Sequence, residues 1–338
     1  MEAQDDISLK SYNTFGIDVK AKRFISVNSV MNLKNIFSSE EFPKKFILGG
    51  GSNMLLTKDI DALVIHLNLK GKTVLEHTKN EALIKCEAGE NWHEFVLWTL
   101  DHNLGGLENL SLIPGNVGAG PIQNIGAYGV ELKDTFLSCD ALNLHTLEIE
   151  TFTNAECNFG YRNSIFKQQA KGKYIILSVT FKLTTNVHEL HTNYGAITSE
   201  LEHKNINQPT IQDVSRAVIA IRERKLPNPK EIGNSGSFFK NPVVSKESFL
   251  KLQNNFPDVP HYIVSKTEIK VPAGWLIEHA GFKGKTFGNY GVHKKQALVL
   301  VNYGGASGKN ILDLSKLIQQ TVARIFGIHI EVEVNIIQ

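Results

Sequence analysis

The sequence predicts an α+β protein built from about two domains. The middle of the chain is rich in short apolar runs that alternate like strands, whereas the part after residue 229 mixes helical and strand patterns. Between them, Leu-Pro-Asn-Pro at 226–229 stops an amphipathic helix and marks a domain boundary. The length of 338 residues fits roughly two domains, or three small ones, since domains usually hold roughly 100–200 residues.

The N-terminal region is expected to form strands and one helix. The predicted strands are FISVNS (24–29), KFILGG (45–50), MLL (54–56) and ALVIHLNL (62–69), and ALIKCEAGE (82–90) is expected to form a strand and a turn. The predicted helix is VMNLKNIFSS (30–39). Asn91 is a candidate N-cap for a second helix, WHEFVLWTLDHNL (92–104).

The later elements follow from the same patterns. We expect strands around 136–153 and 174–184, then the helix TIQDVSRAVIAIRERKL (210–226), which buries Val214, Ala217, Val218 and Ile221. Beyond the boundary we expect helices near 245–254 and 273–281, a strand at 296–302, a long helix between Ser307 and Gly327, and a final strand, IHIEVEVNII (328–337).

Composition excludes several classes of function. The net charge of +2 gives no support for a nucleic-acid or membrane partner. Cys86, Cys139 and Cys157 lie at no metal-ligand spacing, and a sparse, odd set is typical of a reducing compartment. The acidic start of the chain has no signal-peptide pattern, and no apolar run approaches the roughly 20 residues of a membrane span. We therefore expect a cytoplasmic protein without a metal site.

Two glycine-rich segments are candidates for ligand binding. GGGSN (49–53) follows a strand without the G-x-G-x-x-G spacing of a dinucleotide fingerprint. Its bare backbone can form an anion-binding nest, and a tight strand connection explains it equally well. The denser segment PGNVGAGPIQNIGAYG (114–129) favours a loop that contacts a large flat ligand, with Gln123 and Asn124 as hydrogen-bonding side chains.

Several polar residues have two interpretations from sequence alone. Arg162, in FGYRNSIFK, is either a surface arginine or a carboxylate clamp. Glu331 and Glu333 share the polar face of the final strand, and periodicity does not choose between them. Ser237, in GNSGSFFKNP, has no histidine within fifteen positions, so an acyl-transfer nucleophile is not indicated. The basic run RERKLPNPK (222–230) either solvates a helix end or meets phosphates.

Taken in order, several long motifs resemble the UDP-N-acetylenolpyruvoylglucosamine reductase family, also called UDP-N-acetylmuramate dehydrogenase. The motifs are GGGSNMLL, IPGNVGAGPIQNIGAYGVE, GYRNSIFK, KLPNPK, GNSGSFFKNP, AGWLIEHAGFKG and GVHKKQALVLVN. The likeness runs from about residue 12 to the end of the sequence. Tyr194, in NYG, indicates the subtype in which a tyrosine-bearing loop closes over the nucleotide.

The resemblance implies a fold, cofactors and a reaction. The family has a two-part FAD-binding region of the vanillyl-alcohol-oxidase type, followed by a substrate-binding domain. Here these would be residues 1–70 with the strand 331–338 returning to them, then 71–225, then 226–330. NADPH reduces the non-covalent FAD, which reduces the enolpyruvyl double bond of UDP-N-acetylglucosamine enolpyruvate to give UDP-N-acetylmuramate for peptidoglycan. We expect a monomer whose activity supports cell-wall biogenesis, and through it cell shape and division.

The resemblance also assigns site residues. Arg162 and Glu333 match the catalytic arginine and glutamate, and Ser237 matches the serine that donates a proton. The expected FAD contacts are Gly49, Gly50, Gly51, Ser52, Asn53, Pro114, Gly115, Val117, Gly118, Gln123, Asn124, Gly126, Ala127, Tyr128 and Gly129. The expected contacts to the UDP-sugar are Tyr194, Arg222, Lys225, Asn241 and Gln296.

This chemistry gives Ser237 a role as an acid. Hydride addition leaves an enolate that Arg162, helped by Glu333, can stabilise, and protonation by Ser237 completes the reaction, with Lys240 as a cation that could help. The sequence departs from the family at Val332, where a proline is expected, and at Asn335, where a basic residue is expected. Two alternatives stay open: a related FAD oxidoreductase with another substrate, and a nucleotide-sugar-binding protein without redox activity.

Overall fold

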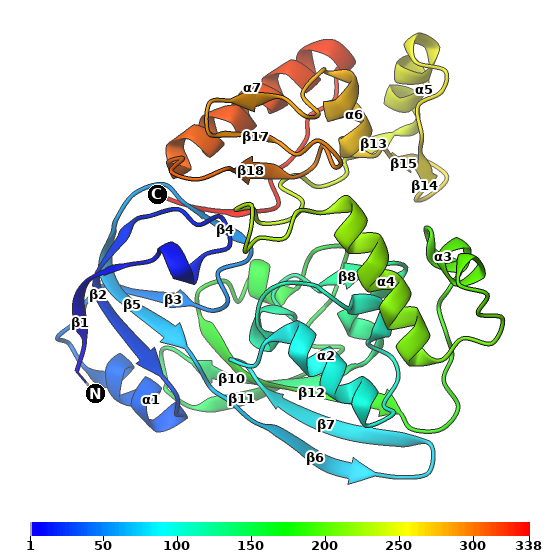
Figure 1. Ribbon diagram of the computed structural model, residues 1–338. Coiled ribbons are helices and arrows are strands. Elements are labelled where there is room, and N and C mark those ends of the chain that lie inside the picture. The colour runs from blue at the N-terminus through cyan, green and yellow to red at the C-terminus, as the bar shows by residue number, and fades with distance from the viewer. Residues whose placement is uncertain (1) are drawn as a thin grey trace. The chain divides into compact units, whose positions relative to one another are not determined.

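The computed structural model describes residues 2–338, which form two compact units (Figure 1). Unit 1 comprises residues 2–5, 22–50 and 61–224. Unit 2 comprises Asp6–Ala21, Gly51–Ile60 and Lys225–Gln338. The division after residue 224 lies next to the proline-rich boundary expected at 226–229, whereas the division into three parts stays a prediction.

The first sheet of unit 1 has four strands in the order β1–β2–β5–β3. Their bounds are β1 (Gln4–Ser8), β2 (Lys20–Val27), β3 (Lys45–Leu48) and β5 (Ile60–Leu67). Helix α1 (Val30–Ser38) follows β2 and begins where the Ser29 side chain accepts a hydrogen bond from Asn32 N. Strand β3 pairs in parallel with β5. Gly49 and Gly50 follow β3 directly, so they lie at its carboxyl end.

The second sheet of unit 1 has five antiparallel strands in the order β11–β10–β12–β7–β6. Their bounds are β6 (Lys72–His77), β7 (Glu81–Glu87), β10 (Phe136–Asn143), β11 (Ile149–Thr153) and β12 (Tyr174–Thr184). One side of the sheet shares a core with α2 (Trp92–Asp101), in which Trp92, Phe95 and Phe181 are almost fully buried. Leu142 and Leu177 join the core of the first sheet, so the two sheets of unit 1 pack together.

Shorter elements complete unit 1. They are β8 (Gly126–Ala127), β9 (Val130–Glu131), α3 (Ile197–His203), α4 (Ile211–Lys225), and the 3₁₀ helices η2 (Glu108–Leu110), η3 (Val117–Ala119), η4 (Leu132–Asp134) and η5 (Ile165–Lys167). Helix α4 buries Val214, Ala217, Val218 and Ile221 against α3, which confirms the predicted apolar face.

Unit 2 combines small sheets with three helices. Its elements are η1 (Lys10–Tyr12), β4 (Met54–Leu56), β13 (Val243–Ser245), α5 (Lys246–Asn255), β14 (Tyr262–Ile263), β15 (Glu268–Lys270), α6 (Ala273–His279), β16 (Thr286–Phe287), β17 (Tyr290–Val292), β18 (Leu300–Asn302), α7 (Gly308–Phe326) and β19 (Asn335–Ile337). The predicted ends of α7 are confirmed, because Ser307 caps its start and Gly327 stops it in the left-handed region at φ 66°.

The structure corrects several strand predictions, among them the strand expected at 296–302, which forms only over Leu300–Asn302 as β18. The final strand was expected over 328–337, but β19 begins only at Asn335, because the preceding residues form a single bridge between Val332 and Phe239 before the chain reaches β4. Strand β6 was not predicted, because most of its side chains are exposed and they show no apolar alternation. Within residues 2–338, every helix is too short or too polar to cross a membrane.

Candidate active site

In unit 1, the turn between β7 and α2 runs beside the start of the second glycine-rich segment. We call residues 88–93 the template turn and residues 110–118 loop 110–118. Five hydrogen bonds join them: Trp92 Nε1 to Leu110 O (2.9 Å), Leu112 N to His93 Nδ1 (3.0 Å), Trp92 N to Gly115 O (2.9 Å), Val117 N to Glu90 O (2.9 Å) and Gly118 N to Ala88 O (3.0 Å). The template turn therefore sets the path of loop 110–118.

The first glycine-rich segment reaches the same loop. A Cβ on Gly50 would lie 2.8 Å from Asn116 Oδ1 and 2.9 Å from Gly115 Cα, so only glycine allows this close approach. A Cβ on Gly49 would meet no atom within 4 Å. Within residues 2–338, the backbone N–H groups of Gly49, Gly50, Gly115 and Asn116 donate no hydrogen bond. Such a group of open N–H donors fits the phosphates of a dinucleotide.

The later part of the glycine-rich segment contains a hairpin and a buried amide. Strands β8 and β9 are joined by Tyr128 and Gly129, both at positive φ as in a type I′ turn. Asn124 is fully buried, and its side chain bonds to Glu131 Oε2, Gly160 O and Lys133 N. The Asn124 side chain thus serves the protein's own packing, and its contact to a cofactor stays a prediction.

Arg162 lies at the tip of a two-residue turn beside this segment. Gly160 and Asn163 exchange backbone hydrogen bonds of 3.0 and 3.2 Å, which holds Arg162 at φ 53°. Its Nη2 donates to Gly126 O at 2.7 Å, and its guanidinium lies 5.3 Å from the centroid of the Tyr161 ring. The structure therefore brings the predicted catalytic arginine to the predicted flavin segment.

Tyr128, Tyr194 and Arg222 form a second group in unit 1. A Cβ on Gly129 would lie 3.2 Å from Tyr194 Cβ, so the half-exposed Tyr194 packs on the β8–β9 hairpin. Arg222 Nε is shielded from solvent and has no hydrogen-bond partner within residues 2–338. Burial lowers the pKa of Arg222, and the nearby Tyr128 opposes this shift. Burial also raises the pKa of Tyr128, and Arg222 opposes that shift. An arginine whose Nε is shielded and has no partner among the described residues is suited to an anionic ligand.

In unit 2, Ser237 and Glu333 lie on paired segments. Residues 237–241, which we call the serine segment, run between residues 298–299 and 331–333. Phe238 N donates to Leu298 O (2.8 Å), Glu333 N donates to Phe238 O (2.8 Å) and Lys240 N donates to Glu331 O (2.9 Å). Ser237 is exposed. Lys240 Nζ lies 3.3 Å from Oε2 of the exposed Glu331, so these two side chains form an ion pair.

Two of the predicted substrate contacts lie at the start of α6. Asn241 Oδ1 accepts a hydrogen bond from Ala273 N (2.9 Å), and Gln296 Oε1 lies 3.3 Å from the Cβ position of Gly274. Gln296 Oε1 also accepts from Leu298 N at 3.2 Å, next to the serine segment. Lys225 is exposed at the end of α4. Ser237, Glu333, Asn241 and Gln296 are thus brought together within unit 2.

The remaining predicted FAD contacts in unit 2 lie before β4. A Cβ on Gly51 would lie 1.9 Å from Tyr12 O, so this glycine permits close packing on η1. Asn53 O accepts from both Asn335 N (3.1 Å) and Asn335 Nδ2 (2.9 Å). Asn335, which stands where the family is expected to have a basic residue, therefore ties β19 to the segment 51–53.

Sequence reasoning missed two side chains of the template turn, Glu90 and His93. Glu90 is only 8% exposed, and His93 accepts the hydrogen bond from Leu112, a non-glycine residue at φ 59°. Neither residue belongs to a glycine-rich motif. The available signal was a charged residue and a histidine that bracket the helix cap Asn91, at the end of a strand.

Comparisons with known proteins cover both parts of the chain. The model of an FAD binding domain matches residues 27–147. The model of the UDP-N-acetylenolpyruvoylglucosamine reductase C-terminal domain matches residues 228–337. The two models contain the template turn and the serine segment, respectively.

Similar proteins match over nearly the whole chain. A UDP-N-acetylenolpyruvoylglucosamine reductase of Flavobacterium johnsoniae is 63% identical over 337 residues, with 100% of both chains covered. One of Pseudomonas fluorescens is 47% identical, with 99% of both covered. The crystal structure of UDP-N-acetylenolpyruvylglucosamine reductase from Thermus caldophilus has the same fold, with a TM-score of 0.69, 22% identity and 100% of both chains covered. The predicted fold class, α+β with an FAD-binding region and a C-terminal domain, is confirmed.

Proposed function

The chain belongs to the UDP-N-acetylenolpyruvoylglucosamine reductase family and is an FAD-binding oxidoreductase of peptidoglycan synthesis, and we propose that it uses NADPH as reductant and Ser237 as proton donor. The substrate of the proposal is UDP-N-acetylglucosamine enolpyruvate. One hydride and one proton add across its double bond, and the product is UDP-N-acetylmuramate. NADPH leaves as NADP⁺, so the electrons balance.

The open N–H groups of Gly49, Gly50, Gly115 and Asn116 are proposed to hold the phosphates of FAD. When bound, FAD supplies the two-electron chemistry by accepting a hydride from NADPH and delivering it to the enolpyruvyl double bond. The segment 119–129 would then lie along the ring system of the cofactor. Gly126 belongs to this segment, and its carbonyl holds the Arg162 guanidinium.

Arg162 is proposed to stabilise negative charge on the substrate. Hydride addition leaves an enolate beside a carboxylate, and a fixed guanidinium lowers the free energy of that charge. The bond from Nη2 to Gly126 O fixes the guanidinium before the substrate binds, so little reorganisation is needed. Glu333, which matches the family's catalytic glutamate, is proposed to assist Arg162 in stabilising this negative charge.

Ser237 is proposed to protonate the carbon that carries the enolate charge. A serine hydroxyl is a weak acid, but an enolate next to a carboxylate is a strong enough base to take its proton. The observation that carries this role is the exposure of Ser237 on a segment whose neighbour, Phe238, is hydrogen-bonded to Glu333. In this pairing Glu333 lies opposite Phe238, one position from Ser237.

The UDP-sugar is proposed to bind through Tyr194, Arg222, Lys225, Asn241 and Gln296. The shielded Nε of Arg222 supports a phosphate contact, because a buried donor without a partner gains most from an anion. Substitution of Arg222 by Ala should raise KM for the UDP-sugar more than it lowers kcat. A fall in kcat alone would contradict the phosphate contact.

The test follows flavin absorbance in anaerobic stopped flow. NADPH should bleach wild type and Ser237→Ala at similar rates. Reoxidation by the enolpyruvyl substrate should be slower in Ser237→Ala by about 10²–10⁴-fold, the usual contribution of a general acid. Ser235→Ala is the matched control, since Ser235 Oγ is bonded to Met54 O and should leave reoxidation near the wild-type rate. Normal reoxidation in Ser237→Ala removes the serine from the mechanism.

A purified protein that cannot be loaded with FAD, or that ignores the enolpyruvyl substrate, would overturn the wider proposal. We further propose that the enzyme works as a monomer in the cytoplasm, where UDP-sugars and NADPH are made. Light scattering on the holoenzyme checks the mass, and cell fractionation checks the compartment.

A further inference from the structure

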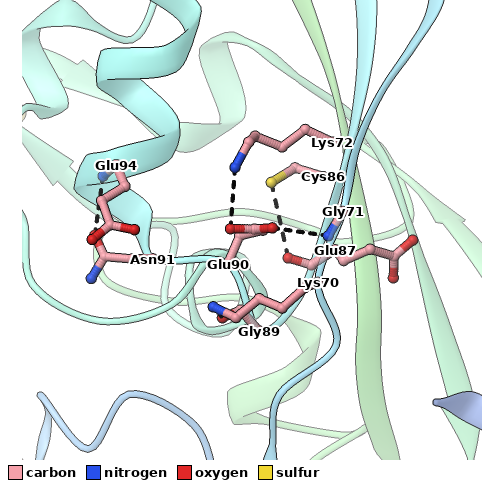
Figure 2. A network of polar contacts seen from close by, with 9 residues as sticks. All are labelled: Lys70, Gly71, Lys72, Cys86, Glu87, Gly89, Glu90, Asn91 and Glu94. Atoms are coloured by element: carbon pink, nitrogen blue, oxygen red, sulfur yellow. Dashed lines mark hydrogen bonds and ion pairs between the residues drawn. The ribbon is translucent and has the colours of Figure 1, made fainter. Parts of the chain in front are cut away.

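Glu90 is a buried carboxylate whose partners come from the start of β6. Figure 2 shows it between Lys72 and Gly71. Glu90 Oε1 accepts a hydrogen bond from Gly71 N (2.9 Å), and Oε2 lies 3.3 Å from Lys72 Nζ. The Glu90 side chain is 11% exposed and that of Lys72 is 25% exposed. Both carboxylate oxygens of Glu90 therefore have partners within the protein, as a buried polar group requires.

The backbone of the same residue reaches loop 110–118. Glu90 O accepts the hydrogen bond from Val117 N, and the neighbouring Ala88 O accepts from Gly118 N. Next to it, Lys70 Nζ donates to Gly89 O, a second bond from the β6 side into the template turn. Glu90 is therefore a two-ended connector, with its side chain bonded to residues 71–72 and its carbonyl bonded to the loop.

This placement differs from that of a comparable ion pair in unit 1. Lys85 on β7 and Asp140 on β10 also form a partly buried pair, with Nζ and Oδ2 2.6 Å apart and side chains 33% and 26% exposed. Asp140 also accepts hydrogen bonds from Thr151 and Ser178. All of these partners lie on sheet strands, so the Lys85–Asp140 pair joins strand to strand and has no bond to loop 110–118.

We propose that Glu90 is a positioning residue for FAD, which holds loop 110–118 in its binding conformation through the bonds to Gly71 and Lys72. The inference rests on the proposed function, in which this loop contacts the cofactor. Loop 110–118 is irregular, with Leu112 and Gly115 at positive φ, so its backbone does not fix itself as a helix or strand would. Its shape depends on the template turn, and the template turn depends on Glu90.

The expected effect is on cofactor affinity. If only a fraction of the apoprotein has the binding conformation, the apparent Kd rises by the inverse of that fraction. We expect Glu90→Ala to raise the FAD Kd by about tenfold or more, because it removes a charged acceptor from two buried bonds. Glu90→Gln keeps an acceptor for Gly71 N and should raise the Kd less.

A rescue separates positioning from a general loss of stability. Lys72→Met leaves Glu90 as a buried charge without its cation, so FAD affinity should fall. Adding Glu90→Gln removes that charge and keeps the Gly71 bond, so the double variant should bind FAD more tightly than Lys72→Met alone. The FAD Kd is measured by quenching of flavin fluorescence on titration with apoprotein, and the apoprotein unfolding temperature is measured alongside.

Asp140→Ala is the matched control, and Gly49→Ala tests the cofactor site itself. Asp140→Ala should lower the unfolding temperature of the apoprotein and leave the FAD Kd within about twofold of wild type, because its partners lie outside the loop. Gly49→Ala adds a Cβ where the structure has no atom within 4 Å, so it should weaken FAD binding without destabilising the apoprotein.

The outcomes are distinguishable. A larger rise in Kd for Glu90→Ala than for Asp140→Ala, with the Lys72 rescue, supports the inference. Equal Kd values for Glu90→Ala and Asp140→Ala, or no rescue, overturn the positioning role while Gly49→Ala still weakens binding. If Gly49→Ala binds FAD like wild type, the proposed cofactor site fails, and the positioning role fails with it.

Discussion

Loop 110–118 and the serine segment are held in place by different kinds of interaction. Loop 110–118 is irregular and depends on side chains: Trp92 Nε1 and His93 Nδ1 bond to its backbone, and Glu90 anchors the turn that supports it. The serine segment is extended and bonded through its backbone on both edges. Its anchors are two phenylalanines, Phe238 and Phe239, which are 0% and 1% exposed.

The difference shows how each part tolerates change. A loop that presents open N–H groups cannot use them for its own folding, so polar side chains elsewhere must fix its shape. An extended segment satisfies its N–H groups in pairing and needs only apolar burial to stay in register. Polar substitutions should therefore affect cofactor affinity, and apolar substitutions should affect the stability of unit 2.

The largest effect is expected for Phe238→Ala. The ring is fully buried and lies edge-on to Phe15 (6.2 Å between centroids) and Phe239 (5.3 Å). Its removal should lower the free energy of unfolding by about 3–5 kcal/mol. Urea unfolding followed by fluorescence measures this, with the more exposed Phe287→Ala as control. Equal losses for both variants would contradict the role given to Phe238.

Next is Trp92→Phe, which keeps an aromatic ring and removes the hydrogen bond to Leu110 O. A buried carbonyl left without its donor costs about 1–3 kcal/mol, and the cost falls on loop 110–118. FAD affinity should therefore drop, as measured by fluorescence quenching. Trp98→Phe on the same helix is the control and should bind FAD as wild type does. Equal weakening of FAD binding in both variants would contradict the role of the Trp92 hydrogen bond in holding loop 110–118.

A smaller effect should appear with pH at His93. Burial, helped by Arg222, lowers the His93 pKa, while Glu94 and Glu223 oppose this shift. Nδ1 of His93 must carry no proton to accept the hydrogen bond from Leu112 N. In the unfolded chain the pKa is about 6.5, so His93's contribution to stability is complete above that pH and is lost as the pH falls toward the lowered folded value.

The same protonation should weaken FAD binding at the lower pH where folded His93 titrates. His93→Asn places Oδ1 near the position of Nδ1 and keeps an acceptor that does not titrate. Both pH dependences should be shallower in this variant, measured as unfolding temperature and FAD Kd between pH 5 and 8, the range in which histidine changes its charge. Unchanged profiles would remove His93 as their source.

The smallest effect is expected for Glu331→Gln. The Glu331 side chain is 78% exposed, and its pair with Lys240 is screened by water. The loss of stability should stay below about 1 kcal/mol. Flavin reoxidation by the substrate should also stay near the wild-type rate, in contrast to Glu333→Gln. A large loss of reoxidation in Glu331→Gln would reverse the choice between the two glutamates.

Much of the fold followed from local signals in the sequence. The caps Asn91 and Ser307, the stop at Gly327 and the buried face of α4 were predicted because each depends on a few neighbouring residues. Strand β6 was missed because it forms by pairing with β7 at the edge of the sheet, while most of its own side chains face solvent. The early part of the final strand was overpredicted because alternation shows burial but not the length of the pairing partner.

The candidate site divides in the same way. Glycine density identified the segments that contain Gly50 and Gly115, because close backbone approach requires glycine. Their contact with each other, and the support from Glu90 and His93, arise from residues 19 or more positions apart in the sequence. Such support follows from tertiary packing, which no local pattern encodes.

The pairing of β19 with β4 also affects synthesis. Ile337 lies opposite Leu56, and Thr57 N donates to Ile337 O, so the last strand joins a partner translated some 280 residues earlier. During synthesis on the ribosome, β4 stays an unpaired edge strand until nearly the whole chain has emerged. Such an edge recruits other extended chains. Ribosomes stalled before codon 335 should therefore carry a nascent chain that binds chaperones, and release of the last residues should end that binding.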